Sequence, residues 1–291
     1  MPLSDAWVDF VAGWCSGAAA VLALQPVDTV LTRWQAGLVA AATTNGPTAS
    51  GGGTAFLRNM ARSLTESAGT TALWRGSSPM IGAVPIQNAL LMGGYGVGQK
   101  YSETYDATNH RIAAIFVGGC TGGILQSFLM SPVELVKVSQ QCAGKSFSAA
   151  SSDVLANIMH SKAWRGLGAT LLRDGVPHGV WFAAYEVCKQ QLKENVIDDP
   201  VIVPLTSGAV AATVAWGVGY PADLIKTRIQ AAAPESALGI VGTARQIIQE
   251  SNGRVIAGLY RGFGLKLVRS VPASMIGFTT YEGVKAALER L

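Results

Sequence analysis

Three ten-residue segments of this sequence share one arrangement of ionisable residues, at 26–35, 132–141 and 221–230. Each begins with proline, carries an acid two residues later and ends with glutamine, and the last two carry lysine five residues after the proline. An acid and a base at i and i+3 lie on one face of a helix. Because each segment follows an apolar run, its charges are costly unless they are paired. These residues therefore predict ion pairing within a helical bundle.

The expected ion pairs join successive segments. Asp28 of the first segment should pair with Lys137 of the second. Glu134 of the second should pair with Lys226 of the third. The glutamines that end the three segments are Gln35, Gln141 and Gln230.

Asp223 of the third segment has no matching cation. The position that carries lysine in the other two segments is Leu31 in the first. Arg33 lies two residues further on, and whether it substitutes is open. With two ion pairs instead of three, the network is expected to open more easily.

A second group of charges lies near the middle of later helices. Arg173 and Asp174 precede Tyr185 by twelve and eleven residues, about 17 Å along a helix that rises 1.5 Å per residue. Arg269 has the corresponding place in the last third of the chain. Ionisable residues at membrane depth are candidates for function, and arginine binds a carboxylate bidentately. The group suits a ligand with a carboxylate and a cationic nitrogen; the alternative is a structural ion pair.

The composition is that of a membrane protein. The chain has 291 residues, of which 49% are hydrophobic and 14% charged, whereas soluble domains average about 25% charged residues. Its mean hydropathy is +0.31. The alternative is a large soluble helical array, whose outer faces should be more charged.

Several other classes find no support in the sequence. The net charge is +4 without a dense Lys/Arg run, so no nucleic-acid partner is expected. The four cysteines form no CxxC pair and are expected to be free thiols. No metal site, cofactor motif, catalytic dyad or P-loop is expected. The N-terminus resembles no cleaved presequence, so any targeting information should be internal.

The spacing of the segments indicates an internal repeat of about a hundred residues. The expected repeats are 1–104, 105–198 and 199–291, within a single domain of residues 1–291. Each repeat should contain a long helix that includes the proline segment, a short surface helix and a second long helix. The expected fold is an all-α membrane protein with six transmembrane helices and both termini on one side.

Individual elements can be placed within this scheme. The first long helix is expected at 7–35, followed by a Gly/Ser-rich loop at 36–54 and a short amphipathic helix at about 55–66. The second long helices of the repeats are expected at about 77–100, 167–192 and 263–288. Small residues recur upstream of each proline and should let helices pack closely. They are Gly13, Gly17, Gly119, Gly123, Gly208 and Ala212.

Two further patterns accompany the second long helices. An aromatic–Arg–Gly element precedes each, at 74–76, 164–166 and 260–262, and suits an anchor at the membrane interface. The last two helices end with a Tyr–Glu–x–x–Lys tail, which either pairs with neighbouring helices or is a solvated helix end. The tail residues are Tyr185, Glu186, Lys189, Tyr281, Glu282 and Lys285.

Together these motifs resemble the mitochondrial carrier family over nearly the whole chain. The resemblance implies a monomeric, threefold pseudosymmetric transporter of the mitochondrial inner membrane, with alternating access and no enzymatic activity. It assigns the proline segments to a matrix gate, whose ion pairs are braced by the three terminal glutamines. It assigns the Tyr–Glu–x–x–Lys tails to a cytoplasmic-side gate. It also implies termini in the intermembrane space and a cardiolipin-like anionic lipid at the aromatic–Arg–Gly elements. Some family members occupy other organellar membranes.

The resemblance also bears on the substrate. Arg173–Asp174 and the segment 79–98 resemble the ornithine, basic amino acid and carnitine/acylcarnitine branch. Ornithine-type carriers have an acid followed by Asn where this chain has Gln87–Asn88, so a second ammonium on the substrate would lack a partner. The implied substrate is a zwitterion, with Gln87 and Asn88 as candidate ligands. Alternatives are a CoA- or nucleotide-like anion, or a degenerate carrier that serves as a membrane scaffold.

Overall fold

The computed structural model describes residues 5–37, 62, 65, 69–103, 108–195, 199, 202–233 and 235–288. These residues form helices and connecting turns, without a strand. The predicted loop at 36–54 and short helix at 55–66 lie almost wholly outside the described residues. Six helices have 26 residues or more: α1 (Asp5–Gln35), α4 (Ser77–Glu103), α5 (Thr108–Cys142), α7 (Leu167–Asn195), α8 (Ile202–Ala231) and α11 (Phe263–Leu288).

Short helices stand between the long ones, as the sequence predicts. They are η1 (Thr70–Trp74), α6 (Phe147–Ala156), η2 (Ser161–Trp164), α9 (Ile240–Glu250) and α10 (Val255–Leu259). The glycines that close the aromatic–Arg–Gly elements are Gly76, Gly166 and Gly262, with φ of 85°, 88° and 88°. Glycine adopts this left-handed conformation without strain. It lets the chain turn sharply into α4, α7 and α11.

Three of the long helices are apolar enough to cross a membrane. They run Trp7–Gln35, Arg111–Cys142 and Ile202–Ala231, within α1, α5 and α8. Each continues through the proline of its repeat, where the helix loses a backbone hydrogen bond. The acids of the repeated segments follow within the same helix.

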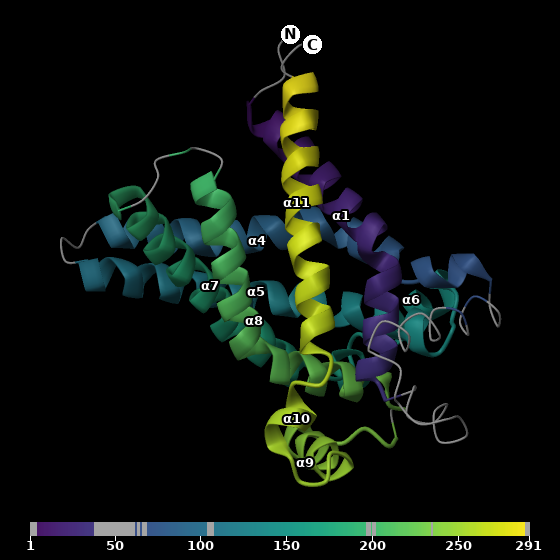
Figure 1. The fold of residues 1–291 in the computed structure, drawn as a ribbon. Helices are drawn as coiled ribbons and strands as arrows, with labels where there is room; N and C mark the ends of the chain where they lie inside the picture. The colour runs from purple at the N-terminus through teal and green to yellow at the C-terminus, as the bar shows by residue number, and fades with distance from the viewer. Residues whose placement is uncertain are drawn as a thin grey trace.

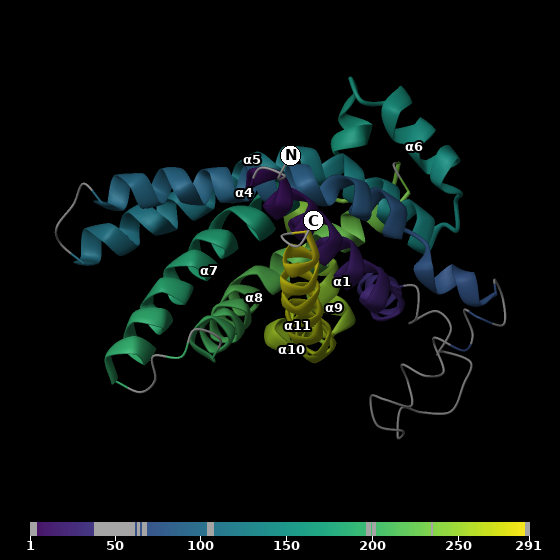
Figure 2. The ribbon, with the colours of Figure 1, turned by 90° about the horizontal axis from the view of Figure 1, so that it is seen from above.

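From α1 to α8 each long helix packs beside the next, and α1 also packs against α11. The helices converge near the ends of α1, α5 and α8 that follow the prolines, and fan apart at their other ends (Figures 1 and 2). α8 and α11 contact each other only sparsely. The start of α1 and the end of α11 lie at the same end of the molecule, where Lys285 Nζ lies 2.8 Å from Asp9 Oδ1.

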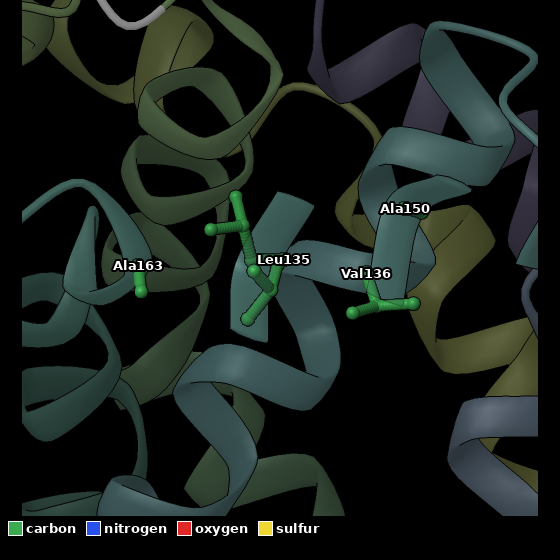
Figure 3. Close-up of a cluster of buried hydrophobic side chains, with 5 residues drawn as sticks. Leu135, Val136, Ala150 and Ala163 are labelled. Carbon is green, nitrogen blue, oxygen red and sulfur yellow. The ribbon is translucent and has the colours of Figure 1, made fainter. Parts of the chain in front are cut away.

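The short helices pack on the converging ends through small apolar clusters. In Figure 3, Leu135 and Val136 of α5 lie beside Ala150 of α6 and Ala163 of η2. In the third repeat α9 contributes Ile247 to a corresponding cluster with α7 and α8. Burial of these groups fixes the converging ends in place.

Close helix packing through small residues is found in some of the predicted places. A Cβ added at Gly123 would lie 2.1 Å from the Asp174 carbonyl oxygen, and one at Gly119 would lie 2.8 Å from Phe182. The same test finds no atom within 4 Å at Gly13 or Gly208. Close packing at these two glycines was therefore a wrong prediction. Gly208 lies in the first part of α8, where the helices diverge.

Backbone atoms also approach closely between α4 and α5. A Cβ built at Gly94 would lie 2.4 Å from the Cα of Gly122, and one at Gly98 would lie 2.8 Å from the Cα of Gly118. Backbone atoms cannot move aside as a flexible side chain can. These four glycines therefore set the distance between the two helices.

Gly94→Ala should lower the thermal unfolding temperature of the purified protein in detergent, because the new methyl group must push α4 away from α5. Gly93 offers a matched control, since a Cβ there meets no atom within 4 Å. Gly93→Ala should be neutral or stabilise the helix by about 0.5–1 kcal/mol. Equal unfolding temperatures for the two variants would contradict this packing.

Candidate functional site

A polar cavity of about 200 Å³ lies where the long helices converge. Four carboxylates and five lysine or arginine side chains line it, so cations exceed carboxylates by one. They are Asp28, Glu134, Asp174, Asp223, Lys137, Arg173, Lys226, Lys266 and Arg269. We refer to these nine residues as the ion-pair network.

The first predicted ion pair is present. Lys137 Nζ lies 2.6 Å from Asp28 Oδ2. Gln141 Nε2 donates to the same oxygen at 3.2 Å, as expected of a brace. A further partner comes from α11, since Arg269 Nε lies 3.0 Å from Asp28 Oδ1. Asp28 therefore joins α1, α5 and α11.

The second predicted ion pair is also present. Lys226 donates to one oxygen of Glu134, and Arg173 Nη1 donates to the other at 2.5 Å. Arg173 binds its neighbour as well, with Nε and Nη2 each 2.6 Å from an oxygen of Asp174. Glu134 therefore joins α5, α7 and α8.

The prediction that Asp223 lacks a cation is wrong. Lys266 Nζ lies 2.9 Å from Asp223 Oδ2, and Gln35 Nε2 donates to that oxygen at 3.1 Å. Arg173 Nη1 lies 3.7 Å from the other oxygen. The missing lysine of α1 is thus matched by a lysine on α11. Leu31 lines the same cavity and is 2% exposed.

The open question about Arg33 is answered, and the expected role of Gln230 is corrected. Arg33 does not take the place of the missing lysine, because its Nε donates to the backbone carbonyl of Gln141 at 2.7 Å. Gln230 does not brace an acid, because its Nε2 donates to the Ser131 carbonyl at 3.4 Å. Each of these side chains instead donates a hydrogen bond to a backbone carbonyl of α5.

The candidate ligand-binding charges are part of the same network. Arg173, Asp174 and Arg269 were expected to present charges to a ligand, yet each already faces an oppositely charged side chain. Gln87 lines the cavity, whereas Asn88 is exposed and does not belong to its lining. A ligand at this site must therefore compete with the protein's own ion pairs.

A second chamber of about 350 Å³ adjoins the polar cavity. The two share Arg173, Asp174, His178 and Trp216. The rest of the chamber's lining is apolar and aromatic: Leu91, Met92, Pro177, Trp181, Phe182 and Ala215. The site thus has a charged part and an apolar part that meet at Arg173 and Asp174.

The opposite end of the bundle carries the Tyr–Glu–x–x–Lys tails. Lys189 lies 3.9 Å from Glu186 on its own helix, and Tyr95 of α4 donates to Glu186 at 3.0 Å. Tyr185 stacks on Trp181 with ring centroids 5.4 Å apart. The hydrogen bond from Tyr95 thus links α4 to α7.

The tail of α11 contacts α1. Lys285 and Tyr281 both donate to Asp9 Oδ1, at 2.8 and 2.7 Å. The Glu282 side chain lies outside the described residues. Among the residues that the structure describes, no ion pair joins the α7 tail to the α11 tail.

Comparison with known proteins identifies the relationship. A family model described as mitochondrial carrier protein matches residues 3–106, 108–196 and 198–290. The chain belongs to the mitochondrial carrier family. Members of this family are transporters rather than enzymes, and the family implies the mitochondrial inner membrane.

Several relatives of this carrier match over almost their whole length. A mitochondrial arginine transporter of Arabidopsis thaliana is 28% identical, over 94% of this chain and 89% of the relative. A mitochondrial carnitine/acylcarnitine carrier-like protein of the same plant is 27% identical, over 98% and 100%. A mitochondrial glycine transporter of Saccharomyces cerevisiae is 29% identical, over 94% and 89%. These names span several solutes.

Sequence reasoning missed three residues of the carrier's cavity. Lys266 occupies a position at which the other repeats have Met80 and Thr170, so a search for repeated motifs passes over it. Its signal was a lysine within an expected membrane span. His178 was not among the candidate site residues, but its Nδ1 lies 2.6 Å from the Asp174 carbonyl oxygen and it lines both chambers. Trp216 gave no signal beyond its aromatic character.

Glu134→Gln should destabilise the carrier by about 3–5 kcal/mol, because two buried cations lose their carboxylate. Thermal unfolding in detergent would measure the loss. Asp153→Asn is the matched control: Asp153 pairs with Lys145 at 2.5 Å, and the side chains are 59% and 47% exposed. An exposed pair contributes less than about 1 kcal/mol. Similar losses in both variants would contradict a structural role for the ion-pair network.

Proposed function

We propose that this carrier moves a small zwitterion, an amino acid or a carnitine-like solute, across the mitochondrial inner membrane by alternating access. The observation that carries the proposal is the incomplete hydrogen bonding of Arg269. Its Nε lies near Asp28 but is buried without a hydrogen bond. A guanidinium held in this way can turn to take a substrate carboxylate with two parallel hydrogen bonds. The excess of one cation in the cavity supports a carboxylate ligand.

The cationic end of the substrate would lie toward Asp174 and the apolar chamber. Trp181, Phe182 and Trp216 line this chamber, and aromatic rings attract ammonium groups. Asp174 would be shared between Arg173 and this ammonium, and each of the other three described carboxylates of the cavity already faces a lysine, so a second ammonium would have to displace one of these lysines. A substrate with one cationic nitrogen is therefore favoured over a dibasic one.

Substrate binding would act directly on the network. A carboxylate bound by Arg269 or Arg173 competes with Asp28 or Glu134 for the same cation. A ligand shifts a conformational equilibrium only through its different affinity for the two states. Competition for these cations supplies that difference, because it weakens the ion pairs that join α11 to α1 and α7 to α5.

The six long helices would be six membrane spans in one monomeric domain, residues 1–291. α4, α7 and α11 have 27, 29 and 26 residues, and about 20 residues suffice to cross a bilayer. Their polar residues would face the cavity. Both termini would face the intermembrane space, and anionic lipid of the cardiolipin type would bind at the aromatic–Arg–Gly elements.

The two ends of the bundle would act as gates. The proposed matrix gate consists of Asp28, Gln35, Glu134, Lys137, Gln141, Asp223, Lys226 and Gln230. The proposed cytoplasmic-side gate consists of Tyr185, Glu186, Lys189, Tyr281, Glu282 and Lys285. Ion pairs join the helices at the end proposed to face the matrix, and the long helices fan apart at the other end (Figure 1).

Uptake of labelled carnitine, glycine, ornithine and arginine into proteoliposomes would test the substrate. Carnitine or glycine should be taken up faster than ornithine or arginine, since neither needs a second carboxylate partner. Arg269→Gln and Asp174→Asn should each slow uptake about tenfold or more, as expected for the loss of a hydrogen bond to a charged group. Asp153→Asn, an acid-to-amide change on an exposed surface, is the control.

The outcomes separate the alternatives. Uptake of none of these zwitterions would overturn the proposal, and uptake of a nucleotide in their place would identify an anion carrier. Full activity of Asp174→Asn would remove Asp174 from the substrate site. Preferred uptake of ornithine would contradict the argument from unpaired carboxylates.

A further inference from the structure

The cation that neutralises Asp223 comes from an unexpected helix. Lys137 and Lys226, which neutralise the other two acids, lie on α5 and α8 within the repeated segments. Lys266 lies on α11, outside those segments, and is 6% exposed. Its ammonium lies 2.9 Å from Asp223 Oδ2 and 3.9 Å from the centre of the Trp216 ring. It is therefore held between a carboxylate and an aromatic face.

Leu31, the residue whose missing positive charge Lys266 supplies, lines the same cavity. Leu31 stands three residues after Asp28, as Lys137 stands three after Glu134 and Lys226 three after Asp223. It is buried and lines the polar cavity together with Asp223 and Lys266. An apolar side chain thus occupies the place of a cation, and a cation stands on the neighbouring helix.

The boundary between α1 and α8 shows the consequence. Gln35 Nε2 donates to Asp223 at 3.1 Å, Thr227 donates to Gln35 Oε1 at 3.2 Å, and Arg228 Nε donates to the Gln35 carbonyl at 2.8 Å. Among the described residues, no ion pair joins these two helices. The Lys266–Asp223 pair instead crosses from α8 to α11, where few other contacts exist.

We infer that Lys266 is the third cation of the matrix gate, relocated from α1 to α11. The inference rests on the proposed carrier function. The gate then has three ion pairs, but the third joins two helices of one repeat and leaves the α1–α8 boundary to hydrogen bonds. Lys266 stands one turn from Arg269, so α11 supplies cations to two of the three gate acids, Asp223 and Asp28.

Relocation of the charge back to α1 tests the inference. Lys266→Leu should slow substrate uptake at least about tenfold and lower the unfolding temperature by several degrees, because Asp223 loses its nearest cation. Lys266→Arg should keep most of the native uptake rate and an unfolding temperature close to the native one. The double variant Leu31→Lys/Lys266→Leu should take up substrate faster and unfold at a higher temperature than Lys266→Leu, since it returns one cation to Asp223. Lys145→Leu, on the exposed α5–α6 turn, should match the native protein.

Two results would overturn the inference. One is a Lys266→Leu variant with native uptake and native unfolding temperature. The other is a double variant no better than Lys266→Leu, even where Lys266→Leu itself fails to fold. Unfolding temperatures need no substrate. If the native protein takes up no tested solute, the proposed function fails while the temperature series still decides the role of Lys266.

Discussion

A carboxylate buried in an apolar helical bundle must find a cation, and the structure of this carrier depends on that constraint. Asp28, Glu134 and Asp223 are 5%, 6% and 4% exposed. Desolvation of an unpaired charge costs several kcal/mol, roughly as much as the net stability of a domain. The cations that pair with them come from α5, α7, α8 and α11. The helices therefore converge at the matrix-gate residues.

The same constraint makes the network usable for transport. Arginines that neutralise buried acids are already oriented toward a cavity and already desolvated. Under the proposed function, a substrate carboxylate would take the place of an internal carboxylate on one of these arginines. Binding of the substrate would then itself loosen the ion-pair network. The apolar chamber beside Arg173 and Asp174 gives the rest of the substrate a separate surface, which is where solutes with a common zwitterionic end would be distinguished.

The sequence predicted what the repeat encodes and missed what lies outside it. The bounds of α7 and α11 and the pairs of Asp28 and Glu134 follow from motifs that recur with fixed spacing. Lys266 occurs once, so no pattern marked it as the partner of Asp223. The partners of Arg173 and Arg269 depend on how α7 and α11 cross their neighbours, which side-chain spacing along one helix does not determine. The absence of close packing at Gly13 and Gly208 likewise depends on how the helices cross, not on spacing along one helix.

Thermal unfolding of the purified native carrier with added solutes tests the central claim most directly, because a ligand that binds the folded state raises the unfolding temperature. The account predicts that carnitine or a neutral amino acid raises it in a concentration-dependent way. The Arg269→Gln variant should lose this response while remaining folded. Stabilisation by a nucleotide with no response to any zwitterion would contradict the account.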